Sequence, residues 1–259
     1  LGREITFYLS QAPEDHTPLP LVVYVQGSGC RSLFVRQGDA IVGQGGHSSV
    51  RDVFAGKARL VIVEKPGVSY LDDPRDPGGA NYAIERFRNE HTLPRWAPAV
   101  RTALDSACKL PDVDCTRVMV IGHSEGALVA CHVAAKEPRV THVATLAGGG
   151  PTQLYDLLAL ARAGAFFKHV SGDPEERVLY VTREWQEILA DPGSPEIRFL
   201  GHPNRRWSTF LSTSPMQELD RTRARVYITQ GTDDDAVALE SFEMLAAHLL
   251  AQGRDVRVD

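Results

Sequence analysis

The chain has 259 residues, of which 43% are hydrophobic and 24% are charged, and this composition is typical of a folded globular protein rather than a disordered or fibrous one. The formal net charge is −5, and the longest basic stretch is the short alternation Arg221, Arg223, Arg225, so no nucleic-acid partner is expected. No apolar run approaches the roughly 20 residues of a membrane-spanning helix, so no membrane span is predicted. The four cysteines lack paired CxxC spacing, and no metal or other cofactor is predicted.

The chain begins at Leu1 without a methionine and soon enters a strand-like stretch, so we expect that an upstream segment has been removed or left out. Short apolar runs rich in valine, isoleucine and leucine recur from there on, and they are typical of strands buried on both faces of a parallel sheet. Amphipathic helical patterns, such as 236–252, lie between them. The alternation predicts an α/β fold with a mostly parallel central sheet and helices on both faces. Strands are expected at 5–9, 21–25, 60–63, 118–121, 140–146, 226–229 and 256–258.

Two cysteines flank the short connection before the strand predicted at 118–121. Cys108 and Cys115 are seven positions apart across a turn, a separation that can bring two Cα atoms within the roughly 4.4–6.8 Å that a disulfide needs. Two small buried thiols fit the same spacing. A disulfide would place the protein in an oxidising compartment, and a periplasmic or secreted location is favoured over the cytoplasm on that account.

A candidate nucleophile follows the strand predicted at 118–121. The segment Gly122-His123-Ser124-Glu125-Gly126 has the form G-x-S-x-G, and it stands between a strand and a helix, the context in which this motif carries a nucleophilic serine. Glycines two positions to either side let the backbone turn sharply without side chains meeting the crossing strand and helix. The spacing predicts that Ser124 is a nucleophile whose developing negative charge lies at a helix N-terminus. A glycine-rich turn without catalysis is the alternative.

With this motif the chain resembles the α/β-hydrolase superfamily of serine hydrolases over nearly its full length. The segment 21–30, which contains Gln26-Gly27-Ser28-Gly29, is similar to the strand and oxyanion loop of that family, with Gln26 where histidine is common. The resemblance implies that the backbone N–H groups of Ser28 and Glu125 hold the oxyanion, with Gly29 as a substitute for Ser28. An ordinary glycine-rich turn after a strand is the alternative for this loop.

The same resemblance indicates the acid of a catalytic triad. After the strand predicted at 226–229, the family pattern of strand, glycine, two residues, aspartate, two residues and valine selects Asp234, with Asp233 and Asp235 as alternatives. A carboxylate in this role holds an imidazole in one tautomer and stabilises its cation. A carboxylate that caps the helix beginning near Ala236 is the other interpretation, and the two roles are compatible.

The base of the triad is not apparent among the nine histidines. The family order is serine, acid, histidine, and the only histidine after Asp234 is His248, in the middle of the last amphipathic helix, where a solvated or packed role is expected. His47 and His202 are weaker candidates. We expect the catalytic histidine in a loop after the last strand, beyond Asp259.

From 151 to 220 no central strand is predicted, and helical patterns at 154–167 and 175–190 alternate with loops. We therefore expect a hydrolase core of 1–150 and 221–259, interrupted by a helical lid-like insertion at 151–220. The leucines and phenylalanines between 157 and 167 could line an acyl pocket, although helical spacing by itself predicts a buried helix face.

The predicted function is a serine hydrolase, first of all a carboxylesterase, that cleaves a small-molecule acyl substrate through an acyl-enzyme on Ser124. A thioesterase or a small peptidase of the same fold is the alternative, as is a catalytically inactive α/β-hydrolase that acts as a binding module. The sequence leaves the substrate and the oligomeric state open.

Overall fold

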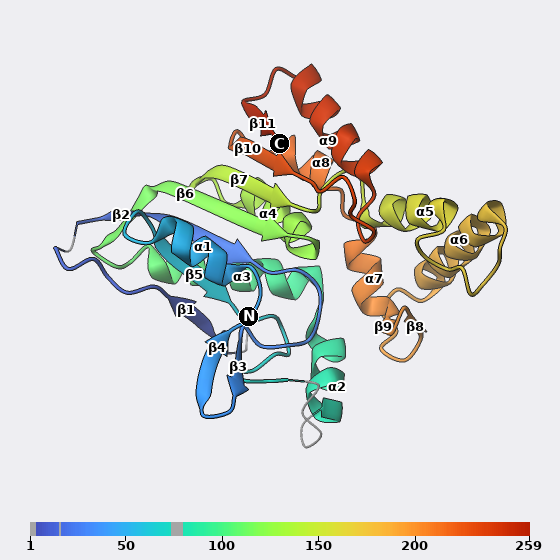
Figure 1. Cartoon of the computed structure of the whole chain (residues 1–259), viewed down its shortest axis with the longest axis horizontal. Coiled ribbons are helices and arrows are strands. Elements are labelled where there is room, and N and C mark those ends of the chain that lie inside the picture. Colours follow the sequence, from blue (N-terminus) through green and yellow to red (C-terminus); the bar gives the residue numbers. More distant parts are fainter. Residues whose placement is uncertain (1–3, 16, 74–79) are drawn as a thin grey trace.

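The computed structural model describes residues 4–15, 17–73 and 80–259 (Figure 1). Its centre is a seven-stranded sheet with the order β1-β5-β2-β6-β7-β10-β11. The first strand is antiparallel to β5, and the other neighbouring pairs are parallel. The strands are β1 (Phe7–Leu9), β2 (Leu19–Val25), β5 (Arg59–Val63), β6 (Val113–His123), β7 (Val140–Leu146), β10 (Arg225–Thr229) and β11 (Val256–Val258).

All seven predicted strands are present, and burial on both faces explains why their sequences are nearly continuous apolar runs. In β2, Leu21 and Val23 belong to the larger hydrophobic cluster on one face, whereas Val22 and Tyr24 belong to the smaller cluster on the other face. Successive side chains of a strand point to opposite faces. The predicted α/β architecture therefore follows from the burial of both faces of the sheet, which requires apolar side chains on each.

Helices cover both faces. The larger cluster packs α3 and α4 against the sheet through side chains such as Trp96, Leu104 and Leu128, and α1 contributes Val50 and Phe54 to the opposite face. The helices are α1 (His47–Phe54), α2 (Ala80–Glu90), α3 (Leu93–Ala107), α4 (Glu125–Lys136), α5 (Gln153–Ala163), α6 (Pro174–Ala190), α7 (Asn204–Phe210), α8 (Pro215–Leu219) and α9 (Leu239–Ala251).

The segment between β7 and β10 is mainly helical. It holds α5 to α8 and a short hairpin of β8 (Arg198–Phe199) and β9 (His202–Pro203), and neither of these strands joins the seven-stranded sheet. Its helices α5 and α6 lie to one side of the sheet (Figure 1), over an apolar cluster of their own that includes Leu157, Phe167 and Trp207. The division at 151 and 220 into core and insertion stays a prediction.

One hairpin was not expected from the sequence. Strands β3 (Phe34–Gln37) and β4 (Ala40–Gly43) pair antiparallel between the loop after β2 and helix α1. Only Val35 of these eight positions is buried, so the segment lacks the apolar run by which the central strands were recognised. None of the helices in the described ranges combines the length and the hydrophobicity that a membrane span requires.

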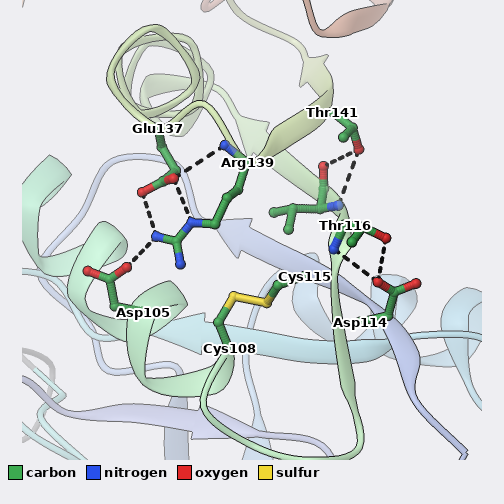
Figure 2. The surroundings of a disulfide bond; sticks show 9 residues. Asp105, Cys108, Asp114, Cys115, Thr116, Glu137, Arg139 and Thr141 are labelled. Atoms are coloured by element: carbon green, nitrogen blue, oxygen red, sulfur yellow. Dashed lines mark hydrogen bonds and ion pairs between the residues drawn. A yellow bond between two sulfur atoms is a disulfide. The ribbon is translucent and has the colours of Figure 1, made fainter.

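Cys108 and Cys115 form a disulfide, so the structure selects one of the two alternatives that their spacing allowed (Figure 2). Their Cα atoms are 5.6 Å apart, within the ordinary range for a disulfide. Cys108 is the C-cap of α3, and Cys115 lies near the start of β6. The bridge therefore ties the end of a core helix to the strand that carries Ser124.

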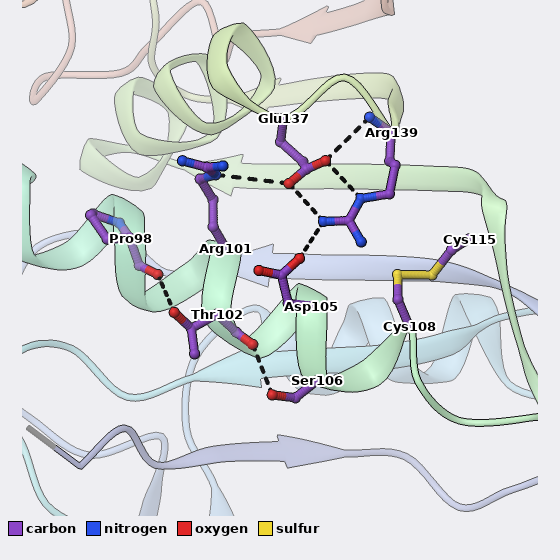
Figure 3. Close-up of polar contacts among 9 residues, drawn as sticks. All are labelled: Pro98, Arg101, Thr102, Asp105, Ser106, Cys108, Cys115, Glu137 and Arg139. Carbon is purple, nitrogen blue, oxygen red and sulfur yellow. Dashed lines mark hydrogen bonds and ion pairs between the residues drawn. A yellow bond between two sulfur atoms is a disulfide. The ribbon is translucent and has the colours of Figure 1, made fainter. Parts of the chain in front are cut away.

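A second set of contacts anchors the same end of the molecule. The Arg139 guanidinium binds Glu137 and Asp105, and the Nε of Arg101 lies 3.8 Å from Glu137 (Figure 3). These pairs join α3 to the connection between α4 and β7. Val118 of β6 pairs with Val140, and Cys115 lies in an irregular part of β6 just before Val118. Six residues at about 3.3 Å each separate Val118 from Ser124, so this anchor and the disulfide lie roughly 20 Å from Ser124 and belong to the scaffold.

Candidate functional site

Ser124 occupies a strained turn between β6 and α4. Its backbone angles are φ 53° and ψ −124°, a combination that non-glycine residues rarely adopt and that costs of order 1–3 kcal/mol. The turn is held because the Ser124 N–H donates to the Leu146 carbonyl at 2.8 Å, and the Ser124 carbonyl accepts from Ala127 at 2.8 Å. The strain is therefore maintained by the neighbouring strand β7 and by the first turn of α4.

Two glycines make this turn possible, as the motif predicted. A Cβ on Gly122 would overlap the carbonyl of Gly126, and a Cβ on Gly126 would lie 2.6 Å from the Gln26 carbonyl. A side chain at either position would force the helix away from the strand or from the loop after β2. The spacing of the motif thus has a steric cause in the fold.

Ser124 opens onto two cavities. One has a volume of about 220 Å³ and is lined by Ser28, Glu125 and side chains of the following segment. The other has a volume of about 320 Å³ and is lined by the loop after β2, by Lys65 and by His123. Ser124 and Ser28 line both. The serine therefore stands between two spaces of different polarity.

The first cavity has an apolar wall that comes from the segment between β7 and β10. Leu157, Leu160 and Phe166 line it, as the sequence allowed, together with Leu128 and Val237. Helix α5 also buries Leu157 against Phe167 in the local apolar cluster. Both interpretations of this helix are thus correct for Leu157, which packs in the cluster and lines the cavity.

The loop after β2 runs directly beside the serine. A Cβ on Gly27 would lie 3.1 Å from the Ser124 Cβ, so only glycine permits this approach without displacement. Gly29 has a φ of +109°, and its carbonyl accepts a hydrogen bond from the Lys65 Nζ at 2.8 Å. Gln26, which replaces the more usual histidine, is half-buried, and its amide has no partner among the residues that the structure describes.

The N–H groups predicted to hold an oxyanion lie next to Ser124. Glu125 is the first residue of α4, and the first N–H groups of a helix have no partner within it. Ser28 follows Gly27 and lines both cavities beside Ser124. The fold therefore brings the loop after β2 and the start of α4 together at the serine.

Asp234 is half-buried, whereas Asp233 and Asp235 are exposed. One Asp234 carboxylate oxygen accepts from the backbone N–H groups of Ala236 and Val237 at 2.8 and 3.0 Å, and the other accepts from the Gln230 Nε2 at 2.9 Å. Helix α9 begins at Leu239, and its N-cap Ala238 makes no side-chain cap bond, so the expected cap of a helix beginning near Ala236 is wrong. Asp234 caps the turn before α9 instead.

Asp234 lies near the elbow. Burial lowers the pKa of His123, and the Asp234 carboxylate partly opposes this effect, which places the two side chains within electrostatic range. Val237, three residues after Asp234, lines the cavity with Ser124. The structure therefore assembles Ser124 and the loop of Asp234 at one edge of the sheet.

The described histidines leave the base unassigned. The His248 Nε2 donates to the Asp220 carboxylate at 2.8 Å on the surface, in agreement with the solvated role expected for it. His47 and His202 line neither cavity beside Ser124. Strand β11 is parallel to β10, and the Asp259 N–H donates to Ile228, so Asp259 stands at the carboxyl edge of the sheet, where Ser124 also lies. The histidine expected beyond Asp259 stays a prediction.

A buried ionic cluster that no sequence pattern predicted lies next to the serine. It consists of Lys65, His91, Glu125 and Arg206, and we call it the Glu125 cluster. The Glu125 carboxylate contacts the His91 Nε2 at 2.7 Å and the Arg206 Nη2. Burial opposes ionisation of Glu125, but Arg206 and His91 outweigh it and lower the pKa of this carboxyl. The only local signal was an acidic residue inside the motif.

Asp156 on α5 was also missed. It lines the first cavity and accepts a hydrogen bond from the Ser241 hydroxyl at 2.5 Å, close to the N-terminus of α9. Burial raises the pKa of Asp156 to about 7, with a smaller contribution from Asp234. An acidic residue on an amphipathic helix gives no sequence signal of this kind. No three His, Cys, Asp or Glu side chains are grouped to hold a metal ion in the part of the chain that the structure describes.

The chain is similar to known proteins in sequence pattern and in fold. The sequence model of the alpha/beta hydrolase family matches residues 49–258. No curated protein matches the chain. Among solved structures, the acylaminoacyl peptidase of Pyrococcus horikoshii is similar with a TM-score of 0.62 and 13% identity over 100% of this chain. The chain spans only 35% of the length of that peptidase.

Two esterases align with this chain over a larger share of their own length. Est1E from Butyrivibrio proteoclasticus, solved with ferulic acid bound, has a TM-score of 0.58 at 15% identity, over 98% of this chain and 84% of Est1E. Acetyl xylan esterase 1 from Thermoanaerobacterium sp. JW/SL YS485 has a TM-score of 0.52 at 16% identity, over 98% of this chain and 71% of the esterase. At these identities the likeness concerns the fold.

Proposed function

This chain belongs to the alpha/beta hydrolase family, and from that premise we propose that it is a serine hydrolase that cleaves a carboxylic ester through an acyl-enzyme on Ser124. The observation that carries the proposal is the conformation of Ser124. A φ of 53° at the junction of β6 and α4 is a strain that a plain structural turn would avoid by using glycine, whereas a nucleophile needs the side chain and must project it from the turn.

In the proposed reaction, the Ser124 Oγ attacks the ester carbonyl and loses its proton to a general base. The N–H groups of Ser28 and Glu125, with Gly29 as the substitute for Ser28, stabilise the oxyanion of the tetrahedral intermediate. Collapse of the intermediate breaks the ester C–O bond, and the alcohol leaves with the proton that the base returns. Water then attacks the acyl-enzyme by the same route and releases the acid.

The base of this reaction is the histidine expected after Asp259, with Asp234 as the acid that orients it. The three hydrogen bonds that Asp234 accepts fix its carboxylate in one position, as an orienting acid requires. The carboxyl edge of the sheet, where β11 ends beside β10, is the place from which a following loop reaches both Asp234 and Ser124.

The two cavities support an ester as the substrate. The cavity of about 220 Å³ with Leu157, Leu160 and Phe166 suits an apolar acyl group. The second cavity, with Gln26 and Arg31 among its lining residues, suits a polar alcohol. An ester whose carbonyl lies at Ser124 would place one half in each.

A peptidase of small substrates is the second candidate, because the fold of an acylaminoacyl peptidase aligns with the whole of this chain. A thioesterase uses the same attacking groups and differs in its leaving group. A binding module without activity is the third possibility, and it requires Ser124 to be unreactive.

Reaction with a fluorophosphonate probe tests the nucleophile. An activated Ser124 forms a P–O bond and expels fluoride, and Ser124→Ala abolishes both this labelling and the hydrolysis of short p-nitrophenyl esters. The exposed Ser212 provides the matched control, because Ser212→Ala should label and hydrolyse like the parent. Residual turnover of Ser124→Ala within about tenfold of the parent would contradict the assignment, since loss of a triad member costs several powers of ten.

A substrate panel then separates the candidates. We expect kcat/KM to be highest for p-nitrophenyl butyrate and lower for a butyryl thioester and for an N-acetylated amino-acid anilide. A preference for the anilide would replace the esterase with the peptidase, and a preference for the thioester would favour the thioesterase. No labelling and no turnover by the full protein would favour the binding module.

We also propose a periplasmic or secreted location. The support is the disulfide between Cys108 and Cys115, because stable disulfides are typical of oxidising compartments. Fractionation of the native host, followed by thiol counting without reductant, tests this proposal. Reduced Cys108 and Cys115 in protein from the native compartment would contradict it.

A further inference from the structure

Lys65 is a buried cation that the proposed reaction has not used. It lies two residues after β5, with 3% of its surface exposed. Its Nζ donates to the Gly29 carbonyl at 2.8 Å and stands 5.6 Å from the centre of the Trp96 ring. Removing an ammonium group from water is costly unless nearby groups compensate, so the position of Lys65 requires an electrostatic reason.

Arg206 brings a second buried cation to the same place. It comes from α7 with 2% of its surface exposed, and its Nη2 binds the carboxylate of Glu125, which is 3% exposed. The guanidinium also stacks over the Trp207 ring, with its carbon 4.0 Å from the ring centre. Helix α7 therefore reaches the residue that follows the nucleophile through a buried ion pair.

The remaining members leave this cluster with excess positive charge. His91 is fully buried, and burial lowers its pKa to about 4, so it is neutral at pH 7. Two cations, Lys65 and Arg206, thus face the single carboxylate of Glu125. Glu64, next to Lys65, lies outside this cluster. Its carboxylate accepts from the Ser32 hydroxyl at 2.6 Å, the Leu33 N–H at 3.1 Å and the Tyr8 hydroxyl at 3.1 Å, and its charge favours the charged form of Lys65 more weakly than Glu125 does.

The excess charge lies behind both halves of the proposed oxyanion hole. Lys65 holds the Gly29 carbonyl in the loop that supplies one N–H donor, and Arg206 holds the side chain of Glu125, whose backbone supplies the other. We propose that Lys65 is the positioning residue of the oxyanion hole, which fixes the Gly29 peptide and places its positive charge behind the site where the tetrahedral intermediate becomes negative. This inference rests on the proposed function, because it needs Ser124 to form that intermediate.

The physical basis is electrostatic preorganisation. A donor or a charge aimed at the position of the oxyanion stabilises the transition state more than the neutral substrate, so its loss lowers kcat and leaves KM nearly unchanged. Only 3% of the Lys65 surface is exposed, so its field is screened less than that of a surface lysine. Loss of a purely structural lysine would instead affect folding, and it would change kcat and KM together.

The charge of Lys65 also predicts a pH dependence. Burial lowers its pKa to about 8, against the opposing effect of Glu125 and the weaker effects of Glu64 and Cys30, while Arg206 lowers it further. The neutral His91 also faces it. Lys65 is charged below this pKa, so activity should be present at pH 7 and decline as the pH rises through about 8.

The test compares Lys65→Met, Lys65→Arg and the exposed-lysine control Lys57→Met in the full protein. Lys65→Met should lower kcat for p-nitrophenyl butyrate about tenfold or more with little change in KM, and weaken by a similar factor an alkyl trifluoromethyl ketone, whose adduct with Ser124 carries an oxyanion. Lys65→Arg should restore much of kcat and move the alkaline decline to higher pH. Lys57→Met should match the parent in every measurement.

Each other result overturns the inference. An unchanged kcat in Lys65→Met shows that the charge is not used, and parallel changes in kcat and KM that arginine does not rescue show a structural role only. If Lys65→Met does not fold, the pH profiles of the parent and of Lys65→Arg provide the test. A decline of activity at the same alkaline pH in both proteins refutes the proposal. Failure of the parent itself to react with a fluorophosphonate refutes the proposed function, and the inference with it.

Discussion

The ion pair between Glu125 and Arg206 offers a quantitative test of the structure, independent of any activity. Both side chains are almost fully buried, at 3% and 2% exposure, and they come from segments 81 residues apart. Arg206→Met keeps a flexible apolar chain over the Trp207 ring and removes only the charge. The variant leaves the Glu125 carboxylate buried with His91 as its remaining hydrogen-bonding side chain, and His91 is neutral at pH 7 because burial lowers its pKa to about 4. Lys65 stays within electrostatic range of Glu125 but makes no ion pair with it.

Removing one partner of a buried ion pair costs about 3–5 kcal/mol, because the other charge stays buried without compensation. At about 2–4 °C per kcal/mol for a chain near this size, the melting temperature should fall by about 6–20 °C. The surface pair of Arg162 and Glu175, whose side chains are 57% and 69% exposed, is the matched control. Arg162→Met should leave the melting temperature nearly unchanged, because exposed ion pairs contribute little to stability.

Urea unfolding at pH 7 of the parent, Arg206→Met, Glu125→Gln and the double variant measures the coupling. The double variant should be more stable than Arg206→Met, because it no longer buries an unpaired charge. The deficit of Arg206→Met should also shrink as the pH falls, since loss of the arginine raises the pKa of Glu125 and protonation then removes the charge. An Arg206→Met variant as stable as Arg162→Met, or a double variant no more stable than Arg206→Met, would refute this account of the cluster.

Three further predictions concern other parts of the molecule. Asp234→Asn should lower kcat for a p-nitrophenyl ester by orders of magnitude, because the amide cannot stabilise an imidazolium, whereas Asp233→Asn at an exposed position should cost little; the reverse ranking in steady-state assays would move the acid. Cys108→Ser should lower the free energy of unfolding by about 2 kcal/mol, the value for a short closed loop, and an unchanged urea midpoint would argue against the bridge. Burial raises the pKa of Asp156 to about 7, above its usual value near 4 in an unfolded chain, so its contribution to stability is complete below pH 4 and is lost as the pH rises through 7. The melting temperature should therefore decline between pH 4 and 7 and decline less in Asp156→Asn, and equal slopes for the two proteins would contradict the assigned pKa.

The sequence by itself determined the features that depend on local pattern. The central strands were recognised because a strand buried on both faces must be apolar at nearly every position, as β5 is. The elbow was recognised because the steric demands of the turn at Ser124 fall on Gly122 and Gly126, two residues away on either side. The resemblance to the family pattern likewise selected Asp234, the half-buried one of three consecutive aspartates, as the acid.

Only the tertiary structure decided what depends on residues brought together from distant segments. Glu125 meets His91 from 34 positions earlier and Arg206 from 81 positions later, and Lys65 reaches Gly29 across 36 positions. A lysine in a loop or an arginine on a short helix is expected to be solvated. Lys65 is buried instead beside Gly29 and Trp96, and Arg206 beside Glu125 and Trp207. The spacing of Cys108 and Cys115 allowed a bridge or two thiols, and the approach of their backbones decided between them. Contacts of this kind leave no pattern in the local sequence. Burial of a charge must be compensated by partner groups, and these come from distant segments that meet only in the folded chain.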